Sequence, residues 1–148
     1  MSNPLLRIIL CGKTTTVGKE VIAGLKPEYE VIRFIISIEE ARKEIPLLFS
    51  GQTENLSKEE GKGSHDYSKI PDGVMLGQGY DKTNAENLEI ICKQQNLKKI
   101  PFFLGDRTKP SPPYGPQYGP HIMKRAREAL ERWRTHPHKE KIDNPILF

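Results

Sequence analysis

The chain has 148 residues, a formal net charge of +4 and a charged fraction of 28%, which suits a single soluble domain spanning residues 1–148. The basic residues are mixed with glutamates instead of forming a block, which argues against nucleic acid as a partner and mildly favours anionic small molecules. No apolar run approaches the ~20 residues of a membrane span, and no basic stretch precedes the N-terminal apolar run, so we expect neither a membrane anchor nor a signal peptide.

The first fifty residues predict two strand–helix units. The apolar run at 5–11 predicts a buried strand, and the periodic apolar positions at 16–25 predict an amphipathic helix. A second branched run at 30–36 predicts another strand. The S-x-x-E pattern at 37–40 predicts a capping box, which opens a helix that we expect to end two residues before Pro46.

The remainder of the chain continues this alternation. Two further strands are predicted at 73–76 and 99–104, and two further helices at 83–96 and 121–135. Between these elements we expect two long loops, the polar segment 50–72 and the proline- and glycine-rich segment 105–120.

Strand and helix thus alternate four times, a pattern typical of a parallel sheet with helices on both faces. Right-handed crossovers give the strand order 2-1-3-4. We therefore expect an α/β fold, a compact Rossmann-like three-layer sandwich with a four-stranded parallel sheet. The apolar tip at 145–148 has no place in this scheme, and together with two open sheet edges it favours a homodimer.

Three polar, glycine-containing segments are predicted at the carboxyl ends of the strands, where ligands of such sheets bind. They are CGKTTTVGK at 11–19, GQGYDKT at 77–83 and GDRTK at 105–109. Because the carboxyl ends of parallel strands lie at one edge of the sheet, we expect these segments to converge on one small-molecule site. This convergence is the strongest functional inference from the sequence.

The first of these segments is a candidate for anion binding. It is not a Walker A loop, because Gly12 and Gly18 are one residue too far apart and Glu20 follows Lys19. It fits the spacing G-x-x-G-x-x-G, which favours a phosphate or carboxylate at the helix N-terminus. The same spacing also suits a purely structural turn. The candidate cofactor-binding residues in this segment are Gly12, Lys13, Thr14, Thr15, Thr16 and Gly18.

In this frame the first 37 residues resemble the dinucleotide fingerprint of the NmrA-like and extended short-chain dehydrogenase families, roughly G-A-T-G-x-x-G. Gly12, Thr14 and Gly18 match, and Thr15 stands at the middle glycine. The resemblance implies a Rossmann fold that binds NADP(H), with Arg33 near the 2′-phosphate. The catalytic Tyr-x-x-x-Lys of classical short-chain reductases does not occur in the sequence.

The other two segments supply candidate catalytic groups. Asp106 is a candidate general acid or base, Arg107 a clamp for a carboxylate or enolate, and Tyr80 a third polar group. An aspartate that only turns the chain and a solvated arginine are the alternative interpretation. The candidate substrate-binding residues are Gly77, Gly79, Asp81, Lys109, Tyr114 and Tyr118.

These features favour an enzyme acting on an anionic or carbonyl-containing small molecule, either by cofactor-free acid–base chemistry of the isomerase, cyclase or dehydratase type or by NADP(H)-linked reduction. The alternative is a non-catalytic NADP-sensing or protein-binding module of the NmrA-like type. We expect no metal, because His136 and His138 have no ligand partner at a suitable spacing. Cys11 and Cys92 fall in predicted core elements, which favours reduced thiols and a cytoplasmic protein.

Overall fold

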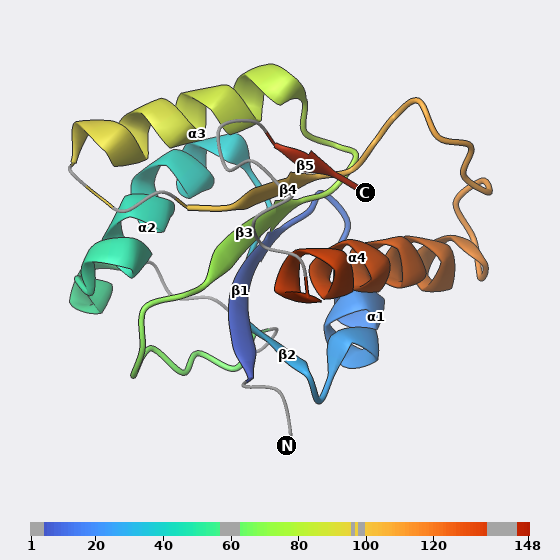
Figure 1. The fold of residues 1–148 in the computed structure, drawn as a ribbon, viewed down its shortest axis with the longest axis horizontal. Helices are drawn as coiled ribbons and strands as arrows, with labels where there is room; N and C mark the ends of the chain where they lie inside the picture. The colour runs from blue at the N-terminus through green and yellow to red at the C-terminus, as the bar shows by residue number, and fades with distance from the viewer. Residues whose placement is uncertain (1–4, 57–62, 96, 98–99, 136–144) are drawn as a thin grey trace.

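A computed structural model describes residues 5–56, 63–95, 97, 100–135 and 145–148. It shows five parallel strands in the order β2-β1-β3-β4-β5, alternating with helices (Figure 1). The α/β class and the order of the first four strands are confirmed. The elements are β1 (Leu6–Cys11), α1 (Thr15–Leu25), β2 (Tyr29–Ile35), α2 (Ile38–Ser50), a 3-10 turn (Thr53–Asn55), β3 (Gly73–Leu76), α3 (Lys82–Gln94), β4 (Phe102–Leu104), α4 (Tyr118–Thr135) and β5 (Ile146–Leu147).

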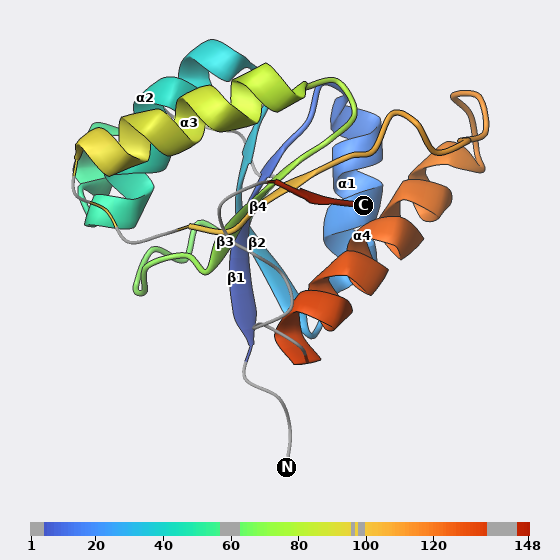
Figure 2. The ribbon, with the colours of Figure 1, turned by 45° about the horizontal axis from the view of Figure 1, so that its top comes forward.

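The helices form two layers around the sheet. α1 and α4 cover one face, and α2 and α3 cover the other (Figures 1 and 2). Each face has its own buried apolar cluster, because successive residues of a strand point to opposite sides. Leu10 of β1, for example, packs toward α1 and α4, whereas Cys11 packs toward α2 and α3. The predicted three-layer, Rossmann-like sandwich is the observed architecture.

The fifth strand is formed by the apolar tip of the chain. Phe103 and Leu104 of β4 pair with Ile146 and Leu147, and the side chains of Ile146 and Phe148 are buried on the α1/α4 face. The tip therefore has a place within its own chain, which the four-strand scheme did not provide. The apolar tip therefore no longer supports the predicted homodimer. The homodimer stays a prediction that rests on the open edges of the sheet alone.

A β-bulge in β2 decides which side chains reach each face of the sheet. Ile8 pairs with Val31 but Ile9 pairs with Arg33, so Ile32 is an extra residue in the strand. Beyond a bulge the alternation of faces is reversed. Arg33 consequently points toward α2, and Phe34 points toward α1 and α4.

The segment that follows residue 62 covers the bulge. The backbone amides of Ser64 and His65 donate to the carbonyls of Val31 and Ile32 at 2.9 Å each. A Cβ on Gly63 would lie 2.5 Å from the Ile32 carbonyl oxygen, so glycine is required for this close approach. The predicted loop 50–72 thus contributes a strap along β2 in its described part, while residues 57–62 lie outside the described residues.

The structure moves several predicted helix ends. α2 continues through Pro46 to Ser50 and is capped by Gly51. Gly51 has a left-handed φ of 80°, and its backbone amide donates a hydrogen bond to the Leu47 carbonyl. The expected stop before Pro46 was wrong, because burial of Ile45, Pro46 and Leu48 favours continuing the helix over the sheet. α4 begins earlier than expected, at Tyr118.

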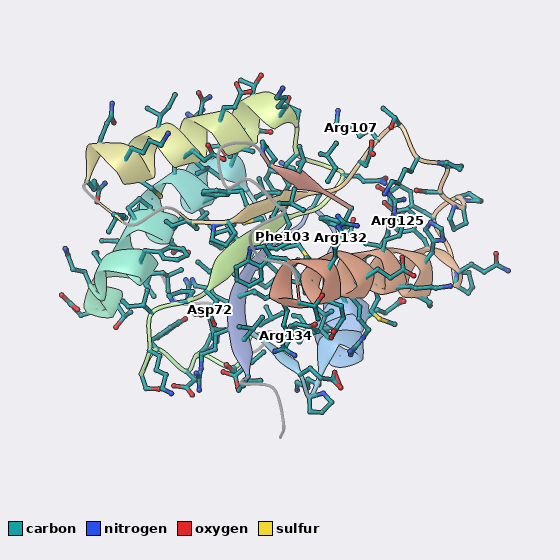
Figure 3. The ribbon with its side chains drawn as sticks, viewed as in Figure 1. Asp72, Phe103, Arg107, Arg125, Arg132 and Arg134 are labelled. Carbon is teal, nitrogen blue, oxygen red and sulfur yellow. The ribbon has the colours of Figure 1, made fainter. Side chains whose placement is uncertain are left out.

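The basic residues of α4 contact the segment between α1 and β2 and the loop after β4. Arg127 forms a 2.7 Å ion pair with Glu28 and donates to the Gly24 carbonyl. Arg134 lies over the Tyr29 ring, with 4.8 Å between its guanidinium carbon and the ring centroid. Arg125 lies between α4 and the loop after β4 (Figure 3). No helix in the described part of the chain has the length and apolarity needed to cross a membrane.

Candidate functional site

The three glycine-containing segments begin side by side at the carboxyl ends of the strands, as predicted, but residues 105–109 of the third segment do not line the same cavity as the first two. Backbone hydrogen bonds extend the sheet by one residue beyond each strand: the Gly12 amide donates to Ile35, that of Gly77 to Cys11 and that of Gly105 to Leu76. The loops that follow β1, β3 and β4 therefore start side by side along one edge of the sheet.

A cavity of about 120 Å³, here called the rim cavity, opens at this edge on the α1/α4 side. Its apolar lining consists of Leu10, Val17, Val21, Phe34, Met75, Ile122, Ala126 and Phe148. Its other lining residues are Cys11, Gly12, Lys13, Thr14, Gly18, Gly77, Gln78, Gly79, Tyr114 and Tyr118. A preformed concave space with mostly apolar walls and a few polar groups is typical of a small-molecule site.

The ring of Phe34 occupies the space that the glycines of the first loop leave open. A Cβ on Gly18 would lie 2.6 Å from Phe34 Cε1 and Cζ, and one on Gly12 would lie 3.1 Å from Cε1. Both glycines are therefore accounted for by the packing of an aromatic side chain. In a dinucleotide-binding turn the glycines instead allow a pyrophosphate to approach the backbone.

The N-terminus of α1 carries no internal cap. Thr14 is the N-cap residue, but its side chain accepts no capping hydrogen bond, and the first turn contains no acidic residue. The predicted residues Gly12, Lys13, Thr14 and Gly18 line the rim cavity. Thr15 and Thr16 are exposed in the first turn and are absent from the described lining.

Lys13 and Tyr80 bring the first two loops together. The Lys13 ammonium lies 4.5 Å from the centroid of the Tyr80 ring, and the Lys13 stem passes so close to Gly79 that a Cβ there would lie 2.4 Å from Cγ. The Tyr80 hydroxyl donates to the Gly12 carbonyl at 3.3 Å. Burial raises the pKa of Tyr80, so the phenol stays protonated at neutral pH.

Gln78 connects the second loop to the third and to α4. Its side-chain amide donates to the Asp106 carbonyl and to Ser111 Oγ at 3.4 and 3.3 Å, and its oxygen accepts from the Tyr118 hydroxyl at 3.3 Å. Tyr118 in turn contacts Tyr114, with ring centroids 4.5 Å apart. The two predicted tyrosines thus form one wall at the mouth of the rim cavity.

Arg125 reinforces the same wall from α4. Its guanidinium donates to Ser111 Oγ at 3.0 Å, to the Asp106 carbonyl at 3.0 Å and to the Phe148 carbonyl at 2.7 Å. The Asp106 amide also donates to the Phe148 carbonyl, at 2.7 Å. Asp106, in the loop after β4, and Phe148, which follows β5, are therefore held together beside the rim cavity.

Asp106 and Arg107 lie outside the rim cavity. Asp106 Oδ1 accepts from both the amide and the hydroxyl of Thr108, which lowers the pKa of Asp106 and closes a turn. Arg107 Nε donates to the Gln78 carbonyl at 2.8 Å. Both residues line a second cavity of about 360 Å³, together with Tyr80, Asp81, Lys82, Leu104, Gly105, Pro145 and Leu147.

Arg33 does not lie where a 2′-phosphate contact would require. It is buried, pairs with both carboxylate oxygens of Glu44 at 2.9 and 3.0 Å, and donates to the Tyr67 hydroxyl. Burial lowers the pKa of Arg33, but the hydrogen bonds to Glu44 and Tyr67 outweigh it and keep the guanidinium charged. The role inferred from the resemblance does not fit this position, because the bulge in β2 turns Arg33 away from the rim cavity.

The remaining predicted residues have structural positions. Asp81 is the N-cap of α3 and forms a capping box with Asn84, so its carboxylate caps the N-terminus of the helix. Gly77 and Gly79 line the rim cavity, whereas Lys109 is exposed and only its amide contacts Asp106. Burial raises the pKa of the Cys11 thiol. Among the described residues no cluster of potential metal ligands occurs, and His136 and His138 lie outside them.

Sequence reasoning missed five residues that shape the site. They are Phe34, Met75, Gln78, Arg125 and Phe148. Gln78 belongs to the predicted second segment, and Met75 lies in β3 just before it. Their position at the carboxyl end of a predicted strand could have identified them. No sequence pattern marks the bulge that brings Phe34 to the cavity.

Comparison with known proteins gives one relationship. No family model matches the chain, and no solved structure does. The chain is 30% identical over 126 residues to kojic acid related protein 6 of Aspergillus oryzae, a match that covers 84% of this chain and 75% of the relative. The chain belongs to the family of kojic acid related protein 6. The name of this family member specifies no reaction, ligand or partner.

Proposed function

We propose that this protein binds a small organic molecule in the rim cavity, with an apolar body enclosed and a polar group at the mouth. The observation that carries this proposal is the cavity itself, a preformed space between β1, β3, α1 and α4 with apolar walls. Its polar lining residues, chiefly Lys13, Gln78 and Tyr118, stand in the loops that follow the strands and at the start of α4. This distribution suits orientation of a ligand by a few polar contacts.

The same geometry argues against a dinucleotide. The Phe34 ring packs against Gly12 and Gly18, so the packing of this ring accounts for both glycines without a pyrophosphate. Arg33 is paired with Glu44 and Tyr67. NADP(H)-linked reduction and NADP sensing are therefore weaker proposals than binding of a smaller ligand.

Binding is also better supported than catalysis at this cavity. Among its described lining residues there is no aspartate, glutamate or histidine, the side chains that most often act as general acid or base. Burial raises the pKa values of the Cys11 thiol and of the Tyr118 phenol, so neither ionises readily. We propose no nucleic-acid partner, because Arg125, Arg127 and Arg134 contact groups of their own chain.

The test is a thermal-shift and calorimetric titration of the full chain with ring-sized organic compounds and with NADP(H). Kojic acid is included among the compounds because the relative's name contains it. The variant Ala126→Met extends a lining side chain into the cavity. The control Ala129→Met enlarges a buried alanine on the same helix that is not a lining residue.

The proposal expects one or more ring compounds to stabilise the wild type and Ala129→Met, and to have no effect on Ala126→Met. Equal stabilisation of both variants would place the ligand elsewhere. Saturable stabilisation by NADP(H) that Ala126→Met removes would favour the dinucleotide alternative instead. Failure of every compound to bind the wild type would overturn the proposal.

Acid–base catalysis in the second cavity is the other candidate function. It is favoured by one observation: Asp106, Arg107 and Tyr80, the three residues proposed from the sequence for this chemistry, all line that cavity. The lowered pKa of Asp106 makes it a carboxylate at neutral pH. Turnover of a carbonyl compound by the wild type that is lost in Asp106→Asn, while ring compounds still bind the rim cavity, would support this candidate.

A further inference from the structure

The size of the rim cavity limits what its ligand can be. An enclosed cavity of ~150 Å³ accepts a benzene ring, and the rim cavity, which is open at its mouth, measures about 120 Å³. The enclosed part of a ligand is therefore limited to a group of about one ring. Phe34 and Phe148 place aromatic rings in its lining, and aromatic walls favour a flat, ring-shaped partner through stacking or edge contacts.

The charge of the rim cavity is one-sided. Among its described lining residues, Lys13 has the only charged side chain, and no side-chain carboxylate balances it. No ion pair joins Lys13 to an acidic residue in the part of the chain that the structure describes. An ammonium without a counter-charge beside an apolar cavity is suited to pairing with an anionic group of a ligand.

The Lys13 side chain contacts two neighbouring residues, Gly79 and Tyr80. The Lys13 stem lies against Gly79, where any larger residue would collide with it, and the Nζ atom stands 4.5 Å from the centroid of the Tyr80 ring. The Tyr80 ring is buried and its hydroxyl is bonded to the Gly12 carbonyl. A cation–π contact of this kind holds the ammonium over the Tyr80 ring without neutralising its charge.

From these observations we propose that the ligand of the rim cavity is a ring-sized organic monoanion, whose ring enters against Phe34 while its carboxylate or comparable anionic group pairs with Lys13. This inference rests on the proposed function, because it names the chemical class of the molecule that the cavity would bind. It also assigns Lys13 as the residue that determines specificity for the anion.

The experiment compares ring carboxylates with their neutral carboxamides by isothermal titration calorimetry on the full chain. The pairs are benzoate and benzamide, phenylacetate and phenylacetamide, and cyclohexanecarboxylate and its amide. Each pair is measured on the wild type, on Lys13→Met and on Lys19→Met. Lys19 is an exposed lysine of α1 that does not line the cavity, so it is a matched control.

We expect at least one acid to bind the wild type and Lys19→Met about tenfold more tightly than its amide, a factor that corresponds to ~1.4 kcal/mol. In Lys13→Met the acid and the amide should bind with similar affinity. The preference of the wild type should also weaken as the salt concentration is raised, because an exposed ion pair is screened.

Two other outcomes overturn the inference and are distinguishable. If amides bind the wild type as tightly as acids, or if Lys13→Met keeps the preference, the cavity binds small molecules but does not select an anion. If neither acids nor amides bind the wild type, the proposed function fails together with the inference.

Discussion

Gly18 of α1 and Phe34 of β2 occupy adjoining space so closely that a single methyl group between them would collide. A Cβ on Gly18 would lie 2.6 Å from two carbons of the Phe34 ring. The ring is in that position because the bulge in β2 turns Phe34 toward α1. The missing side chain of Gly18 therefore leaves room for the Phe34 ring in the wall of the rim cavity.

Gly18→Ala should consequently destabilise the protein. Alanine favours a helix by ~1 kcal/mol over glycine, but overpacking of a buried ring typically costs ~1–3 kcal/mol, so we expect a net loss of unfolding free energy in urea. Gly77→Ala is the control, since a Cβ there would make only an ordinary contact of 3.5 Å with the Cys11 carbonyl oxygen. The double variant Gly18→Ala/Phe34→Leu should recover most of the loss. An unchanged stability of Gly18→Ala would contradict the packing described.

The buried pair of Arg33 and Glu44 should tolerate removal of both charges better than removal of one. Each has at most 5% of its side chain exposed, and breaking such a pair typically costs ~3–5 kcal/mol because one charge stays buried without its counter-charge. Glu44→Leu should therefore be much less stable than Arg33→Met/Glu44→Leu in urea unfolding. Equal stabilities of the single and double variants would show that the pair is not coupled.

Cys11 and Cys92 should resist thiol reagents in the folded protein. Burial raises the pKa of Cys11, and it raises that of Cys92 to about 11, so both thiols stay protonated at pH 8.5. The sign of the linkage follows: the folded state favours protonated thiols, so their contribution to stability is complete below the unfolded pKa of ~8.5 and declines as pH rises above it. Reaction with a chromogenic disulfide reagent should be slow in buffer and fast in guanidinium. Rapid reaction of Cys11 in the folded Cys92→Ala variant would contradict the burial of the Cys11 thiol.

Arg125 should control the order of the third loop and of β5. It donates to Ser111, to the Asp106 carbonyl and to the Phe148 carbonyl, and a hydrogen bond from a charged group contributes ~1.5–3 kcal/mol. Arg125→Met should lower the unfolding free energy by about that amount and speed amide hydrogen exchange at Asp106 and Phe148, whose amides pair with this segment. Arg132, on the same helix near β5 (Figure 3), donates to the Leu147 carbonyl at 3.5 Å. Arg132→Met is therefore the comparison for loss of a contact with β5, and it should leave the exchange at Asp106 unchanged. Exchange rates that Arg125→Met does not alter would count against this role.

Much of the fold was accessible from the sequence because apolar periodicity directly reflects burial. The runs at residues 5–11 and 30–36 and the amphipathic stretch at 121–135 all correspond to observed elements. The placement of three glycine-containing loops side by side also followed, since parallel strands end at one edge. Their convergence on one site did not, because the third loop lines a different cavity. β5 was missed because a two-residue strand carries no periodic signal.

The side chains of the site were less predictable than its place. Register within a strand decides which face a residue occupies, and one bulged residue, Ile32, exchanges the faces of Arg33 and Phe34. The sequence therefore suggested an arginine where the structure places a phenylalanine. Asp106 illustrates a different limit, because a turn aspartate bonded to Thr108 and a catalytic aspartate have the same sequence context.

The most direct test of the rim cavity as a small-molecule site is a methyl NMR titration of the full chain with benzoate and, separately, with NADP(H). The reporters are the methyl groups of Val17, Val21, Met75, Ile122 and Ala126, which line the cavity; those of Leu48 and Leu88, buried on the opposite face, serve as controls. The account predicts saturable shifts of the lining methyls with benzoate, none with NADP(H), and no change in the controls. Saturable shifts of the same methyls with NADP(H), or the absence of any shift with ring compounds, would contradict it.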